Sequence, residues 1–322
     1  MKKCIFFPFS TKKVSGNPYC DNYRNALLKY VEIINQNSKF KGNIRYQLLK
    51  SSFAADIYIF NWLESINSGI KGFFLFLFSH LSLIIIWLRK KEIIWMFHNI
   101  HPHSGENLYS RIIQGFLFKK STCIITHSKE AMDYAKRKAS CPVYYFCHPV
   151  NQKVYTITKK CDCDVFIWET ILSYKGIPEF LELMKDQDYT IRIIGQCNSS
   201  ELEKRIVEMC NKNVIYENRR ADFDEIASWC QASRFVVFPY IGNSISSSGA
   251  LIDTITMGGV PVGPDCGAFH DLEIEKVCIT YNDESELLEI LQGNNTVSQN
   301  ARSAFQEKYS WAAFAQFVSH LL

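Results

Sequence analysis

The stretch between residues 235 and 272 constrains the fold of this chain more than any other. It reads FVVFPYIGNSISSSGALIDTITMGGVPVGPDCGAFHDL. The apolar run Phe235–Phe238 ends at a proline, and a loop rich in Gly, Asn and Ser follows. The segment Ala250–Met257 is typical of a helix, two glycines end it, and Val260–Val262 begins another strand. The order strand, loop, helix, strand predicts one βαβ unit.

The serine-rich loop of this unit is a candidate phosphate site. It follows the carboxyl end of a predicted parallel strand and precedes the amino end of a helix, which carries roughly half a positive elementary charge. That arrangement suits a phosphate-bearing ligand. The candidate groups are Ser246, Ser247, Ser248 and Gly249 of the loop, together with the carboxylate of Asp253 in the following helix. A solvated serine loop and an exposed carboxylate are the alternatives.

Both halves of the chain alternate strand-like and helix-like segments, which predicts an α/β fold with parallel sheets and right-handed crossovers. The 322 residues exceed the ~100–200 residues of one average domain. We therefore predict two doubly wound, Rossmann-like domains facing across a cleft. The predicted boundaries are 1–150 for the N-terminal domain, 151–163 for a linker and 164–322 for the C-terminal domain, whose last helix is able to cross back to the first domain.

Apolar spacing also predicts single elements. We expect a helix over Tyr23–Gln36, a strand over Ile44–Leu49 and a helix over Asn300–Leu322. The segment Phe73–Leu88 is apolar apart from two serines and one histidine, and three basic residues follow it. It is shorter than the about 20 apolar residues that span a bilayer. We expect a buried helix, with partial insertion into an anionic membrane surface or a true span as alternatives.

Composition argues against several other classes. The net charge of +4 comes without a concentrated basic stripe, so we do not expect nucleic acid as a partner. The 12 cysteines are scattered and only Cys161 and Cys163 are close-set, which favours reduced thiols over a metal site. The first residues pass directly into an apolar strand, so we expect no signal peptide and a cytoplasmic protein.

Several short segments occur in the order and spacing of a known family. Those in the second half are Tyr174-Lys175-Gly176-Ile177, Ile194-Gly195-Gln196, Val214-Ile215-Tyr216 with Asp224-Glu225-Ile226, Phe238-Pro239-Tyr240, and Gly249 with Gly259-Val260-Pro261-Val262. Those in the first half are Asn61-Trp62-Leu63-Glu64 and Trp95-Met96-Phe97-His98-Asn99 with Pro102-His103. Together they resemble GT-B nucleotide-sugar glycosyltransferases, group 1 and family-4-like, of bacterial capsule, O-antigen and exopolysaccharide biosynthesis.

The resemblance implies transfer of a sugar from a nucleoside-diphosphate sugar, linked to UDP or GDP, to a saccharide or polyprenyl-linked acceptor. It implies no metal and a cytoplasmic location, with contact at the inner face of the membrane left open. The family's two glutamates, eight residues apart, fall on Ser246 and Thr254, and its arginine falls on Thr170. Its retaining chemistry is therefore not implied. An epimerase or phosphorylase on the same fold, or an inactive nucleotide-sugar-binding protein, remains an alternative.

In the second half, Lys175 follows a strand and is placed to neutralise a leaving diphosphate. Gly195 allows close backbone approach at a strand end, and Gln196 and Tyr240 belong to the matching segments. Arg219 follows another strand and could reach the base or a phosphate. A solvated lysine is the alternative for Lys175, and turn and surface positions are the alternatives for Gly195 and Arg219.

In the first half, His98 ends a predicted strand, and an imidazole titrates near neutral pH. It could contact the donor or act as the base on an acceptor hydroxyl. Glu64 is the first choice for a carboxylate base, ahead of Asp21 and Glu106. The residues predicted to line the acceptor side are Asp21, Trp62, Asn99 and His103. A core histidine is the alternative for His98.

Overall fold

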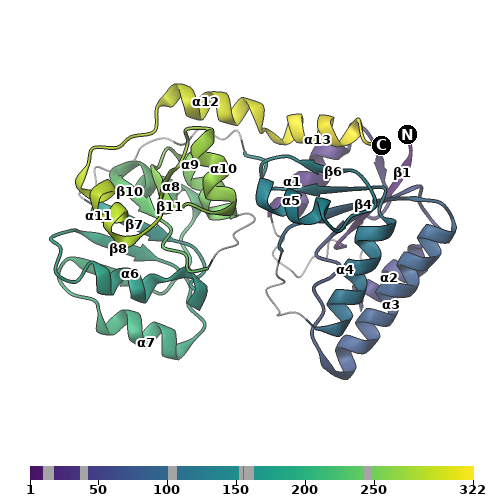
Figure 1. The fold of residues 1–322 in the computed structure, drawn as a ribbon, viewed down its shortest axis with the longest axis horizontal. Coiled ribbons are helices and arrows are strands. Elements are labelled where there is room, and N and C mark those ends of the chain that lie inside the picture. Colours follow the sequence, from purple (N-terminus) through teal and green to yellow (C-terminus); the bar gives the residue numbers. More distant parts are fainter. Residues whose placement is uncertain (10–17, 37–42, 101–106, 152–154, 156–162, 243–247) are drawn as a thin grey trace. The chain divides into compact units, whose positions relative to one another are not determined.

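The computed structural model of the chain describes residues 1–9, 18–36, 43–100, 107–151, 155, 163–242 and 248–322. The chain forms two compact units (Figure 1). Unit 1 comprises Met1–Pro149 and Trp311–Leu322, and unit 2 comprises Val150–Ser310. Each unit contains a six-stranded sheet in which every described strand pair is parallel. The predicted α/β class with two Rossmann-like sheets is confirmed.

The sheet of unit 1 has the strand order β2-β1-β3-β4-β5-β6. Its strands are β1 (Lys3–Phe7), β2 (Glu32–Ile33), β3 (Ile57–Asn61), β4 (Glu92–Phe97), β5 (Cys123–Thr126) and β6 (Val143–Tyr145). Its helices are α1 (Pro18–Leu27), α2 (Ile44–Ser51), α3 (Gly69–Leu88), α4 (Leu108–Lys120), α5 (Lys129–Lys136) and α13 (Trp311–Ser319). The central strand β3 is buried at all of its positions, because a parallel sheet is covered on both faces.

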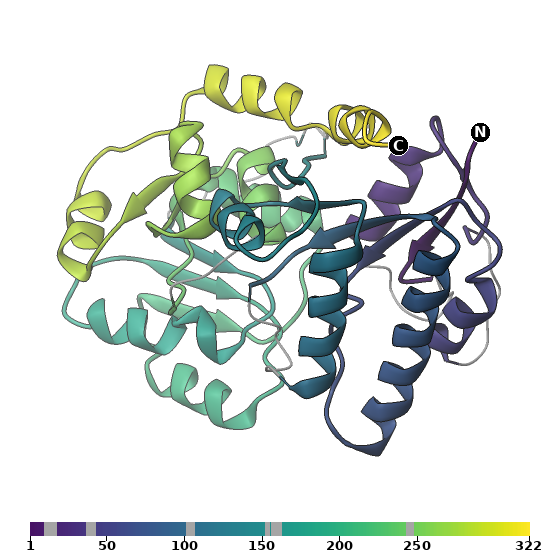
Figure 2. The same cartoon turned by 45° about the vertical axis from the view of Figure 1, so that its right-hand side comes forward.

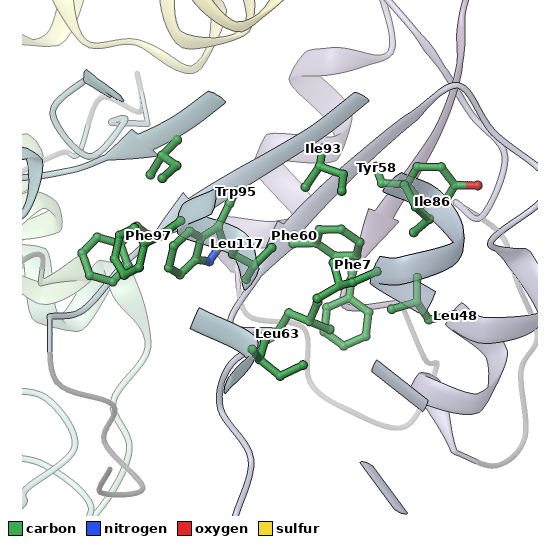
Figure 3. Close-up of a cluster of buried hydrophobic side chains, with 14 of the residues drawn as sticks. Phe7, Leu48, Tyr58, Phe60, Leu63, Ile86, Ile93, Trp95, Phe97 and Leu117 are labelled. Carbon is green, nitrogen blue, oxygen red and sulfur yellow. The ribbon is translucent and has the colours of Figure 1, made fainter. Parts of the chain in front are cut away.

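Two cores flank this sheet, because successive side chains of a strand point to opposite faces. One core joins strand residues such as Phe60 and Trp95 to helices α2 to α5 (Figure 3). The other joins alternate strand residues such as Ile59 and Met96 to α1 and α13. Helices α2, α3 and α4 lie side by side over the first core (Figure 1, Figure 2).

The sheet of unit 2 has the strand order β12-β11-β10-β7-β8-β9. Its strands are β7 (Cys163–Trp168), β8 (Ile191–Ile194), β9 (Val214–Glu217), β10 (Ser233–Val237), β11 (Pro261–Pro264) and β12 (Ile279–Tyr281). Its helices are the short 3-10 helix η1 (Ser173–Lys175), α6 (Ile177–Leu183), α7 (Ser200–Glu208), α8 (Phe223–Ala232), α9 (Gly249–Met257), α10 (Gly267–Ile274), α11 (Glu284–Gln292) and α12 (Gln299–Lys308).

The βαβ unit predicted from residues 235–272 is present as β10, α9 and β11. Strands β10 and β11 pair in parallel, and Gly258 ends α9 with a left-handed backbone (φ 92°). Arg302 of α12 is buried and donates to the carbonyl of Ile255, at 3.2 Å, and to that of Gly259. This guanidinium therefore satisfies carbonyls at the carboxyl end of α9.

Three element predictions are wrong. Residues 44–51 form α2 and not a strand, because the Asn43 side chain accepts from two backbone N–H groups and caps a helix. The predicted helix over Tyr23–Gln36 is replaced by α1, which ends at Leu27, and by the edge strand β2. The segment from Asn300 onwards forms two helices, because Ser310 pairs with Val150 in a β-bridge between them.

Helix α3 departs from the expectation of a buried helix. By length and composition alone the helix could cross a membrane, because an 18-residue stretch of it has a mean hydropathy of 1.9. Only 28% of that stretch is buried. The buried positions are Gly72, Ser79, Ser82, Leu83 and Ile86. Its other side chains are half-buried or exposed.

Candidate functional site

Three histidines gather at the carboxyl edge of the sheet in unit 1. His98 follows β4, His127 follows β5 and His148 lies three residues after β6. His98 and His127 are buried and His148 is half-buried. The phenol of Tyr19, from α1, lies among them, with ring centroids 5.0 Å from His98, 5.5 Å from His127 and 5.1 Å from His148. Trp311 of α13 packs on the same phenol at 5.3 Å.

Hydrogen bonds fix the protonation pattern of two of these rings. His127 Nδ1 is 2.7 Å from the carbonyl of Phe146, so it carries the proton, and Nε2 accepts from the Tyr19 hydroxyl at 2.7 Å. Asn61 donates its amide N–H to the carbonyl of Phe7, so its oxygen faces His98 Nε2 at 3.0 Å. His98 therefore donates from Nε2, and Nδ1 is its basic nitrogen.

Burial keeps these imidazoles neutral. It lowers the pKa of His98 well below the ordinary range, and His127 and His148 lower it further. It lowers the pKa of His127 to about 3 and that of His148 to about 4. Trp62 stacks on His98 with centroids 4.1 Å apart, and its backbone φ of 51° is in the left-handed region. Such backbone conformations cluster at functional sites.

The other residues predicted for the first half lie differently. Glu64 is buried, and its carboxylate accepts from the Trp95 indole N–H at 3.2 Å, so the contacts described do not bring it to the histidines. Burial raises the pKa of Glu64 to about 7. Asp21 forms an ion pair of 2.8 Å with Arg24. Asn99 is half-buried beside His98, whereas His103 and Glu106 lie outside the described residues.

A buried polar network occupies the corresponding edge in unit 2. Lys175 Nζ lies 2.5 Å from a Glu169 carboxylate oxygen and also donates to the Tyr240 hydroxyl. Tyr240 donates to the same carboxylate oxygen at 2.6 Å, and its hydroxyl lies 3.1 Å from that of Ser248, the N-cap of α9. The network therefore joins the ends of β7 and β10 to the amino end of α9.

The ion pair within this network is well shielded from water. The side chains of Lys175 and Glu169 are 8% and 10% exposed. Burial raises the pKa of Glu169 and lowers that of Lys175, while their mutual attraction opposes both shifts. Glu169 has a φ of 146°, so strain and a buried charge coincide at one residue. Lys175 is thus a buried, ion-paired cation and not the solvated lysine of the alternative interpretation.

Backbone geometry around this network explains two glycines. A Cβ on Gly176, which has a φ of 63°, would lie 2.0 Å from the carbonyl oxygen of Pro239. A Cβ on Gly195 would lie 2.1 Å from the carbonyl oxygen of Glu169. Gly195 therefore allows the ends of β7 and β8 to approach each other, which is a close backbone approach at a strand end.

The remaining residues predicted for the second half are partly engaged elsewhere. Arg219 is held by the carboxylates of Glu217 and Glu225 at 2.7 and 2.6 Å. Gln196 accepts from Arg220 at 2.7 Å. Asp253 is half-buried on α9, and burial raises its pKa to about 7. Gly249 is the first residue of α9. Ser246 and Ser247 lie outside the described residues.

A pocket of about 290 Å³ opens beside Tyr240, at the carboxyl ends of β10, β11 and β12. Its charged lining residues are Glu179, Asp283 and Glu284, and no Lys or Arg of the described chain lines it. A diphosphate therefore fits better at Lys175 and the amino end of α9 than in this pocket.

One cluster among the described residues has the composition of a metal site. It consists of Asp265, His270 and Glu273, whose ligand atoms lie within 4.8 Å of one another. The three side chains are exposed, and acidic groups of this kind are common without an ion.

Sequence reasoning missed His127, His148 and Glu169 as members of these clusters. Each follows the carboxyl end of a parallel strand, as His98 does. Ligand sites of such sheets form at that edge. Applying this rule to every predicted strand, and not only to the segments with a family resemblance, would have found all three.

The two six-stranded parallel sheets give the chain a GT-B fold. HepE of Anabaena, solved with UDP and glucose, matches with a TM-score of 0.71 at 12% identity over 99% of both chains. A sucrose-phosphate synthase from Thermosynechococcus elongatus gives a TM-score of 0.70 at 13% identity over 100% of this chain and 98% of that one.

AviGT4, a glycosyltransferase involved in avilamycin A biosynthesis, gives a TM-score of 0.64 at 11% identity over 100% of this chain and 97% of the other. HepE has also been solved with UDP-glucose. No protein-family model and no curated protein matches the sequence. The likeness is therefore one of fold.

Proposed function

We propose that this chain is a glycosyltransferase that moves a sugar from a nucleoside-diphosphate sugar to a saccharide or lipid-linked saccharide acceptor. The observation that carries the proposal is the network of Lys175, Glu169, Tyr240 and Ser248 at the amino end of α9. It supplies a buried cation and a helix amino end at the sheet edge where phosphates bind. Structures of the same fold contain UDP and UDP-glucose.

In the proposed reaction the acceptor hydroxyl oxygen attacks the anomeric carbon, and the bond from that carbon to the phosphate oxygen breaks. The nucleoside diphosphate leaves with the electron pair of that bond, and its developing charge is stabilised by Lys175 and the dipole of α9. The hydroxyl proton passes to a base. His98 is our candidate, because its Nδ1 is the basic nitrogen and its ring is held by Asn61 and Trp62.

We further propose that no metal is needed, since Lys175 and α9 supply the positive charge, and that activity persists in a chelator. A cytoplasmic role in the biosynthesis of bacterial capsule, O-antigen or exopolysaccharide is supported by the resemblance of the segments around Trp62 and His98. An acceptor panel of lipid-linked saccharides tests that part.

The donor is tested by thermal shift with UDP-, GDP-, CMP- and dTDP-sugars, since a ligand of the native state raises Tm. Sugars linked to one of these four nucleotides should raise the Tm of the wild type. The double variant Lys175→Met with Glu169→Gln removes both charges without leaving either one buried alone, and should lose the shift. Lys185→Met is the control, because Lys185 is 66% exposed in an ion pair with Glu182.

Turnover is tested by release of the nucleoside diphosphate in the presence of acceptor. His98→Gln should keep the donor-induced shift and lose turnover, whereas His320→Gln, at an exposed position, should keep both. Full activity in His98→Gln and in the double variant would contradict the site. Donor binding by the wild type without transfer to any acceptor would favour the alternative of an inactive nucleotide-sugar-binding protein.

A further inference from the structure

Helix α3 presents an apolar stripe that unit 1 leaves uncovered. Ile70 is 82% exposed, Phe74 50%, Leu81 39% and Leu88 65%. Their spacing of four and seven residues places them on one helical face. The opposite face packs into the core through Leu83 and Ile86. The stripe is therefore a surface feature along the whole length of the helix.

The neighbouring helices extend this surface. On α4, Leu108 and Ile112 are exposed at helical spacing, and Tyr46 of α2 and Phe53 just after α2 are exposed on the other flank. Trp87 is exposed at the carboxyl end of α3. We call the exposed side of α2, α3 and α4 the α2–α4 face. Exposed apolar side chains gathered on neighbouring helices mark an interaction site more often than isolated apolar residues do.

The charge of the α2–α4 face has one sign. Helices α2, α3 and α4 and the three residues after α3 contain no Asp or Glu, although the whole chain has 32 of them. The exposed cations are Lys50, Lys71, Lys90, Arg111, Lys119 and Lys120. Cations also lie over exposed rings, with Lys120 4.4 Å from Trp87 and Arg89 5.3 Å from Phe53.

We propose that the α2–α4 face docks on an anionic lipid surface, with α3 lying in the plane of the interface. Aliphatic and aromatic side chains flanked by Lys and Arg are what such a surface binds, through apolar burial and attraction to anionic headgroups. A second copy of the chain fits less well, because a two-fold interface would bring cations of the same face together.

The connectivity of α3 argues against a membrane span. The helix connects β3 to β4, which are neighbours in the sheet. Crossing a bilayer would remove Leu83 and Ile86 from the core that they share with Phe60 and Trp95. Partial insertion of the exposed stripe leaves these contacts intact.

The direction of α3 relates the docking face to the site. The helix starts after the carboxyl end of β3, so its amino end lies toward the sheet edge that carries Trp62 and His98. If the proposed function holds, a lipid-linked acceptor would reach that edge along the membrane plane. The docking itself does not depend on transfer activity, so binding and turnover can fail separately.

The test is flotation of the full chain with vesicles of phosphatidylcholine alone or mixed with phosphatidylglycerol. The wild type should float with the mixed vesicles, more weakly with phosphatidylcholine, and dissociate in high salt. Neutralising Lys50, Lys71 and Lys119 to Gln should weaken binding about a hundredfold, at roughly fivefold per cation. The pair Phe74→Ser and Leu88→Ser should also weaken it, through lost apolar burial.

Matched controls lie on unit 2. The pair Val207→Ser and Ile274→Ser replaces side chains that are 53% and 54% exposed. The triple change of Lys185, Lys204 and Lys212 to Gln removes the same charge from exposed positions. Both controls should float like the wild type, and an alkaline carbonate wash should release all bound protein.

The proposal is overturned by equal flotation with both vesicle types, or by variants of the α2–α4 face that bind like the controls. Protein that resists the carbonate wash would indicate a span and also overturn it. A wild-type dimer in sedimentation that Phe74→Ser with Leu88→Ser dissociates would assign the face to a second copy instead.

Discussion

Two buried groups in unit 1 should make opposite contributions to the pH dependence of stability. Burial lowers the pKa of His127 from 6.5 to about 3 in the folded chain. At pH 5 the ring is therefore neutral when folded and protonated when unfolded. Because the unfolded state binds more protons, stability falls as the pH falls below 6.5. Between pH 7 and pH 5 this amounts to about 2 kcal/mol.

Glu64 works in the other direction. Burial raises its pKa from 4.5 to about 7. Between these values the folded state binds the proton and the unfolded state does not, so this contribution grows as the pH falls. Over the same interval, from pH 7 to pH 5, it is again about 2 kcal/mol. The two effects largely cancel in the wild type, so only variants reveal them.

The assay is urea unfolding of the wild type, His127→Gln and Glu64→Gln at pH 7 and pH 5. On going to pH 5, His127→Gln should gain about 2 kcal/mol relative to the wild type, and Glu64→Gln should lose about 2 kcal/mol. His320→Gln, at an exposed position, should follow the wild type. Variants whose stability runs parallel to that of the wild type, or which shift with the opposite sign, would refute the reasoning.

Three further predictions concern unit 2. A phosphate beside Glu169 should raise the pKa of its carboxyl further, so donor binding should take up a proton and weaken as the pH rises. Calorimetry in buffers of different ionisation enthalpy measures the proton uptake, and Glu169→Gln should abolish that uptake. Gly176→Ala should destabilise by at least about 2 kcal/mol in denaturant titration, because of its positive φ and the nearby Pro239 carbonyl. Its control is Gly115→Ala in α4 of unit 1, where an added Cβ meets nothing within 4 Å; this change should be neutral or stabilise by up to about 1 kcal/mol. Arg302→Met should lower Tm, since two carbonyls at the end of α9 lose a buried donor, at a cost of about 1–3 kcal/mol.

The βαβ unit was predictable because its signals are local. Its signals are the apolar run of β10, the glycines after α9 and the strand that follows them. They lie close together in the sequence, and each indicates a single type of structure. Residues 44–49 carry a short apolar pattern that fits both a strand and a helix. Asn43 resolves that ambiguity as a helix cap, and it was the signal that the prediction overlooked.

The candidate site was predictable only in part. His98 and Lys175 lie in segments with a family resemblance, whereas His127 and Glu169 do not. Pairing of β4 with β5 brings His98 and His127 together from distant parts of the sequence. Pairing of β7 with β10 likewise brings Glu169 to Tyr240. The ion pair of Lys175 was not predictable from the sequence either, because its partner Glu169 has an unusual backbone conformation that no local pattern signals.

The way in which unit 2 is inserted into unit 1 has a consequence for synthesis on the ribosome. Residues 150–310 form one continuous unit, so that part can fold as soon as it emerges. Unit 1 cannot, because α13 supplies Phe314 and Val318 to the core that also holds Phe6 and Tyr23. Until residues 311–319 leave the exit tunnel, that core stays open to solvent and to chaperones. Unit 1, most of which is synthesised first, is therefore expected to complete its folding last.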